Sequence, residues 1–157
     1  VCLAIRDVLC AMAETHRVHY VHPPGESRRL PRCQGDSDLA HGLLDLLEPA
    51  PEAIFILTDG YDNAPATRAR DIIRALPKIG LDIPVVQITP VMAAEAEGIR
   101  LLHQGILSLA VSQVESLAVG LLKLAFHADL QMGANALWEI LTTRSSARKL
   151  LEESAWN

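Results

Sequence analysis

The fold is decided by residues 53–60, which read AIFILTDG. The apolar run from Ala53 to Leu57 lacks the polar alternation of a half-exposed strand, and such runs are typical of strands buried on both faces. Thr58, Asp59 and Gly60 then end the strand, because Asp and Gly favour tight turns. The stretch therefore predicts a strand of a parallel sheet that helices cover on both faces.

The segments around this strand alternate between helical and extended patterns. Apolar residues at helical spacing predict helices over residues 1–14, 39–47, 65–79, 93–103, 113–126 and 134–155. Apolar or β-branched runs predict strands over residues 16–22, 53–57, 83–89 and 105–111. Arg144, Ser145 and Ser146 weaken the pattern of the last helix, so a break is expected there.

This alternation predicts an α/β fold with a doubly wound, mostly parallel, Rossmann-like sheet and helices on both faces. The composition changes near residues 129–133. We therefore expect a partial α/β domain over residues 1–128 and a helical C-terminal extension over residues 129–157.

Composition excludes several classes of protein. Half of the 157 residues are apolar, which disordered chains are not. The net charge of −5 argues against a nucleic-acid binder, which needs a basic face. No apolar stretch reaches the roughly 18 residues of a membrane span.

The cysteines and the first residue bear on cellular context. Cys2, Cys10 and Cys33 form no recognisable disulfide framework or zinc site, which favours a reducing compartment such as the cytoplasm. Cys2 and Cys10 fall in a helical pattern, where we expect small buried side chains. Because the chain begins at Val1 without a Met, we interpret it as part of a larger protein.

Two segments place oxygen ligands where α/β sheets bind their ligands, beyond the carboxyl ends of the strands. One is Thr58-Asp59-Gly60, and the other is residues 35–39, which read GDSDL and enter a helix. Carboxylate and hydroxyl oxygens suit Mg²⁺, which prefers octahedral oxygen coordination. We expect the side chains of Ser37 and Asp59 to lie close together at this edge.

The same two segments resemble the metal-ion-dependent adhesion site of von Willebrand factor A domains. Residues 54–60 resemble the strand and Thr-Asp-Gly that end this site. Residues 35–39, with the Leu-rich helix after them, resemble the family's Gly-x-Thr-x-Leu segment. The order of the elements also fits over roughly residues 1–126. The resemblance implies a protein-binding or scaffolding module that recruits an acidic group of a partner through Mg²⁺.

Carried over by position, the resemblance assigns metal ligation to Ser37, through its hydroxyl, and to Asp59, through water. Ser37 replaces the family's Thr, and Asp36 and Asp38 match variable positions. The family's Asp-x-Ser-x-Ser segment occurs nowhere in the sequence. It would follow a first strand that precedes Val1. We therefore expect this chain alone to bind Mg²⁺ weakly and the intact protein to bind it well.

Two alternatives remain open. Asp59 would serve as a metal ligand or general base in a Rossmann-like hydrolase or transferase, although no nucleophile elbow, P-loop or dinucleotide fingerprint is present. A degenerate A domain would act as a scaffold without metal. The remaining features are interpreted structurally: His16, His19 and His22 as partly exposed residues at the edge of a strand, Arg28, Arg29 and Arg32 as a solvated loop, and Trp138 with Leu137, Ile140 and Leu141 as packing.

Overall fold

The computed structural model describes residues 2–21, 37–63, 66–91 and 100–154. The chain divides into two compact units, Val1–Val114 and Glu115–Asn157. The predicted arginine loop, Cys33, His22 and most of the helix predicted over residues 93–103 lie outside the described residues.

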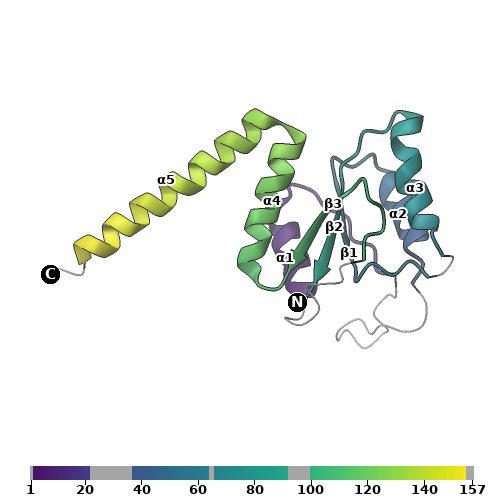
Figure 1. The fold of residues 1–157 in the computed structure, drawn as a ribbon, viewed down its shortest axis with the longest axis horizontal. Helices are drawn as coiled ribbons and strands as arrows, with labels where there is room; N and C mark the ends of the chain where they lie inside the picture. Colours follow the sequence, from purple (N-terminus) through teal and green to yellow (C-terminus); the bar gives the residue numbers. More distant parts are fainter. Residues whose placement is uncertain (1, 22–36, 64–65, 92–99, 155–157) are drawn as a thin grey trace. The chain divides into compact units, whose positions relative to one another are not determined.

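The first unit is built on a three-stranded parallel sheet in the order β1-β2-β3 (Figure 1). The strands are β1 (Ile54–Leu57), β2 (Val85–Pro90) and β3 (Leu107–Val111). Ile54 lies beside Val85, and Val86 lies beside Leu107. The predictions of strands over residues 53–57, 83–89 and 105–111 are thus confirmed. The arrangement is α/β and compatible with a Rossmann-like fold.

Helices lie on both sides of this sheet. Figure 1 shows α2 and α3 on one side of the strands and α1 on the other. Their bounds are α1 (Cys2–Met12), α2 (Leu39–Leu47) and α3 (Arg68–Ala75), followed by the 3₁₀ helix η1 (Leu76–Ile79). Gly80 ends η1 at a φ of 78°, in the left-handed conformation that glycine adopts without strain. Helices were predicted at all three places, although the predicted start at Pro65 lies outside the described residues.

The main core forms between the sheet and the α2–α3 pair. The buried side chains come from two α-helices, the 3₁₀ helix, two strands and one loop: Leu39, Leu43, Ile54, Ile56, Ala69, Ile73, Leu76, Val85 and Leu102. Arg68, Arg70 and Arg74 lie on the exposed face of α3, as predicted. The helical spacing of the apolar residues therefore predicts the buried faces of α2 and α3 correctly.

The prediction that β1 is buried on both faces is wrong. Ile54 and Ile56 are buried, but Phe55 and Leu57 are only partly buried. The strand buried on both faces is β2, in which every residue from Val85 to Thr89 is buried. The reason is position, because β2 has a strand on each side, whereas β1 pairs with β2 alone within the described part of the chain.

The strand predicted over residues 16–22 is also not formed in its described part. Residues 16–20 have no regular secondary structure. Side chains hold this segment instead: His19 Nδ1 lies 3.1 Å from Asp45 Oδ2 on α2, and Arg6 on α1 donates a hydrogen bond to the Tyr20 hydroxyl. His19 is thus partly exposed, as the sequence predicts, but it contacts α2 and does not lie on a strand. On α1, Cys2 is exposed rather than buried, and Cys10 is partly buried.

The second unit contains α5 (Leu130–Ser154) and all of α4 (Val114–Ala128) except its first residue. Helices were predicted in both places. The break expected at residues 144–146 is absent, because Arg and Ser are tolerated within a helix that is otherwise rich in good helix formers. No helix of the described residues is long and apolar enough to cross a membrane.

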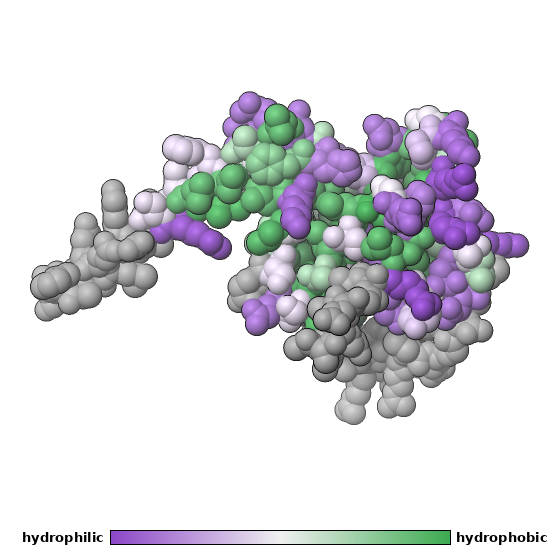
Figure 2. Space-filling view, viewed as in Figure 1, coloured by the Kyte–Doolittle hydropathy of each residue, from purple (hydrophilic) through white to green (hydrophobic). Residues whose placement is uncertain are grey.

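Hydrophobic side chains on α5 are largely exposed. Gly133 lies so close to α4 that an added Cβ would come within 2.4 Å of the Phe126 ring, which fixes the contact at the first turns of α5. Trp138 is 71% exposed and Leu141 is 53% exposed, so the predicted packing of Trp138 is wrong. Figure 2 shows this hydrophobic surface in green along the first part of α5. These side chains of α5 remain exposed because α5 extends beyond α4 within this unit (Figure 1).

The start of α2 supplies a first testable prediction. Asp38 is its N-cap, and the carboxylate accepts a 3.0 Å hydrogen bond from the backbone N–H of His41. Asp38→Ala removes this bond, so we expect the free energy of unfolding in urea to fall by about 1 kcal/mol. Asp82→Ala removes an exposed carboxylate elsewhere and is the control. Equal losses in the two variants would contradict a capping role.

Candidate functional site

The turn that follows β1 is closed by its own side chains. Thr58 Oγ1 accepts a 3.1 Å hydrogen bond from the backbone N–H of Gly60. Asp59 Oδ1 accepts a 3.1 Å hydrogen bond from the backbone N–H of Tyr61. Asp59 itself is exposed. One carboxylate oxygen is thus fixed by the turn, and the carboxylate is accessible to a ligand at the carboxyl end of a parallel strand.

Gly60 allows this turn to touch a distant segment of the chain. Its φ is 89°, and it is buried. A Cβ built on it would lie 2.1 Å from the carbonyl oxygen of Arg100, far inside van der Waals contact. Only glycine therefore permits both the backbone conformation and the close approach to Arg100.

Gln87, on the sheet, forms hydrogen bonds to the segment that contains Arg100. This residue of β2 is completely buried. Its Nε2 donates to the Arg100 carbonyl oxygen at 2.7 Å and to Thr89 Oγ1 at 3.0 Å. Its Oε1 accepts from the Leu102 backbone N–H at 2.9 Å. A buried amide is costly unless it is hydrogen-bonded, and here the bonds serve to fix residues 100–102 over the sheet.

The sequence predicts a helix over residues 100–103, but these residues are not helical. Their contacts with Gln87 explain the difference. An α-helix would direct the Leu102 N–H to the carbonyl four residues earlier in the chain. In the structure this N–H bonds to Gln87, and the Leu102 side chain, 5% exposed, joins the main core. The signal in the sequence was a single Gln within the apolar run of β2.

The side chain of Arg100 adds a positive charge beside the turn. Its Cζ lies 4.1 Å from the centroid of the Tyr61 ring, within the range of a cation–π interaction. Both side chains are exposed, and Tyr61 is two residues after Asp59. Sequence reasoning missed this pair because it depends on the long-range contacts of Gly60 and Gln87.

Ser37 directly precedes the N-cap of α2 and is half-buried. Helix α2 begins at the end of the sheet where the strands end (Figure 1). Hydroxyl and carboxylate oxygens are ligands that suit Mg²⁺. Within the described ranges, no three His, Cys, Asp or Glu side chains form a metal-binding group. Direct proximity of Ser37 and Asp59 stays a prediction.

Asp62 is a further acidic residue that sequence reasoning missed. Its Oδ2 accepts a 3.0 Å hydrogen bond from the backbone N–H of Ala69, in the first turn of α3. Its Oδ1 is buried and has no hydrogen-bond partner among the described residues. Thr67 precedes the helix in a left-handed conformation and does not cap it through its side chain. Asp62 therefore accepts a hydrogen bond from a backbone N–H in the first turn of α3, although it lies seven residues before Ala69 in the sequence.

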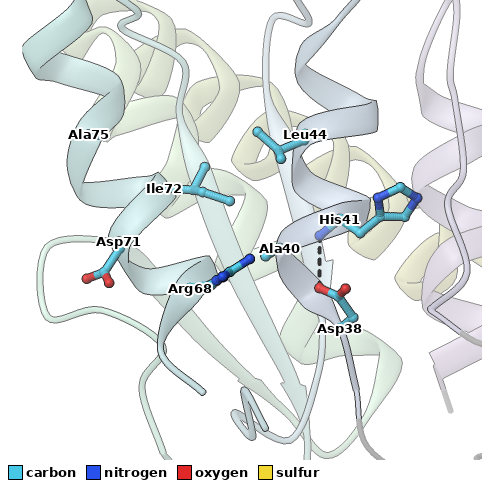
Figure 3. Close-up of a pocket in the computed structure, with 8 residues that line it drawn as sticks. All are labelled: Asp38, Ala40, His41, Leu44, Arg68, Asp71, Ile72 and Ala75. Carbon is cyan, nitrogen blue, oxygen red and sulfur yellow. Dashed lines mark hydrogen bonds between the residues drawn. The ribbon is translucent and has the colours of Figure 1, made fainter. Parts of the chain in front are cut away.

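An open groove of about 460 Å³ lies between α2 and α3 (Figure 3). Its walls carry charged and apolar side chains of both helices: Asp38, Ala40, His41, Leu44, Arg68, Asp71, Ile72 and Ala75. His41 Nε2 lies 3.8 Å from the Asp45 carboxylate that also contacts His19. The groove has charges of both signs, so it does not select one class of ligand.

Comparison with known proteins adds no functional assignment. No protein-family model, curated protein or solved structure matches the chain. The functional argument therefore rests on the edge of the sheet where Asp59, Tyr61 and Arg100 meet.

Proposed function

We propose that the chain is a protein-binding module of the von Willebrand factor A type, with a doubly wound sheet. In this proposal Ser37 and Asp59 contribute to a Mg²⁺ site that recruits an acidic group of a protein partner. The observation that carries it is the exposed Asp59 carboxylate, fixed by Tyr61 at the carboxyl end of a parallel strand. Ligands of α/β sheets bind at that edge.

The donors present fit a hard cation. Asp59 offers a carboxylate whose Oδ1 is already oriented by a backbone N–H, and Ser37 offers a hydroxyl beside the start of α2. Mg²⁺, when bound, supplies positive charge that few protein carboxylates neutralise, so it attracts the carboxylate of a partner. The remaining ligands would come from an Asp-x-Ser-x-Ser segment before Val1, as the resemblance implies.

Calorimetric titration with Mg²⁺ tests this function. In the intact protein, Asp59→Asn is expected to weaken Mg²⁺ binding about tenfold or more, because it removes a charged ligand. Asp82→Asn, which removes an exposed carboxylate elsewhere, should leave the affinity unchanged. The chain 1–157 alone should bind Mg²⁺ only weakly. An intact protein whose Mg²⁺ affinity is the same with and without the Asp59 carboxylate would contradict the metal site.

A further inference from the structure

The backbone of Arg100 is fixed by contacts from two different strands and their ends. Gln87, completely buried in β2, binds the Arg100 carbonyl oxygen and the Leu102 N–H. Gly60, in the turn after β1, packs directly on the same carbonyl oxygen. Leu102 is buried in the main core. The backbone at Arg100 is therefore held in place before any ligand binds, which reduces the entropy lost when the side chain binds a ligand.

The guanidinium of Arg100 is oriented by an aromatic ring, and no carboxylate of the described ranges neutralises it. It stacks on the Tyr61 ring at 4.1 Å, and both side chains are exposed. No carboxylate of the described residues forms an ion pair with it, in contrast to Arg6, Arg17 and Arg70. Stacking on an aromatic face leaves the edge of the guanidinium free for two parallel hydrogen bonds to a carboxylate.

We infer that Arg100 and Tyr61 form a receptor for a carboxylate on an acidic segment of a protein partner. The inference rests on the proposed function in placing a protein partner at this edge, but it needs no metal ion. Arg100 binds the carboxylate with its free edge, while Tyr61 holds the guanidinium plane in place. The net charge of −5 disfavours acidic partners over the chain as a whole, so a fixed cation that pairs with no carboxylate of the described residues directs them to this position.

A hexaglutamate peptide is the probe for this receptor. Binding is measured by NMR titration of the chain 1–157 at low ionic strength with EDTA, because salt screens exposed charges. Arg100→Gln is expected to weaken binding about tenfold, and Arg100→Lys about threefold, because lysine keeps the charge but loses the planar fork. Arg74→Gln removes an exposed arginine of α3 and is the matched control, expected to change affinity less than about twofold. The amide signals of Gly60 and Tyr61 should shift on binding.

Several outcomes would overturn the inference. Equal weakening by Arg100→Gln and Arg74→Gln would show a general charge effect, and unshifted Gly60 and Tyr61 signals would place the peptide elsewhere. Inorganic phosphate that displaces the peptide at equal concentration would identify an anion site rather than a protein-binding one. Peptide binding that needs Mg²⁺ and Asp59 but not Arg100 would refute the inference and leave the proposed function standing. Binding that depends on Arg100 in EDTA supports the inference even if the Mg²⁺ titration fails.

Discussion

Gly60→Ala is expected to lower the free energy of unfolding by about 2–4 kcal/mol. The left-handed conformation costs a residue with a Cβ about 1 kcal/mol. The new methyl group would also lie 2.1 Å from the backbone carbonyl oxygen of Arg100, and relieving such an overlap costs about 1–3 kcal/mol. Because the overlapping atom belongs to the backbone, no side-chain rotation can remove it. Urea denaturation of the chain measures the loss.

Gly80→Ala is the matched control for this substitution. Gly80 has a similar φ of 78°, but an added Cβ would meet no atom within 4 Å. Gly80→Ala should therefore lower the free energy of unfolding only by the cost of the left-handed conformation, about 1 kcal/mol. If the two variants lost the same stability, the close approach of Gly60 to Arg100 would be wrong.

Gln87→Leu is expected to lower the free energy of unfolding by about 2–6 kcal/mol, although leucine is similar in size and more apolar. The substitution leaves the Arg100 carbonyl and the Leu102 N–H without their partner, and each unsatisfied buried group costs about 1–3 kcal/mol. Hydrogen exchange at the Leu102 amide should accelerate more than exchange within β1 or β2. The measurement separates a local release of residues 100–102 from a general loss of stability.

Gln113→Leu tests whether any glutamine would behave in this way. Gln113 is exposed, so its replacement should change stability by less than about 0.5 kcal/mol. Should Gln87→Leu be as mild as this control, or should the Leu102 amide stay protected, the anchoring role of Gln87 would be refuted.

The elements that the sequence predicts well are those with a local physical cause. The apolar runs of β1 and β2 specify strands, the periodic leucines of α2 specify a helix with one buried face, and Asp38 specifies where α2 begins. The strand predicted over residues 16–22 fails because β-branched and aromatic residues indicate a preference but supply no neighbouring strand to pair with.

The candidate site could be predicted only in part, for a related reason. Asp59 was found because the turn that exposes it is encoded within a few residues. Arg100 and Tyr61 come together only through Gln87 and Gly60, whose contacts join parts of the chain far apart in sequence. The exposure of Trp138 depends equally on tertiary structure, since its apolar neighbours on α5 look the same whether or not another helix covers them.

The open side of β1 has a consequence for how the sheet would grow. The order β1-β2-β3 runs in one direction, and β1 pairs with β2 alone within the described part of the chain. An edge of this kind presents unpaired backbone N–H and C=O groups, which act as a template for pairing with a further strand. A strand that joined it, whether from an upstream segment or from another polypeptide, would hydrogen-bond to β1 and place one of its ends beside the turn that carries Asp59. The same edge is therefore where two copies of the chain would associate through their backbones.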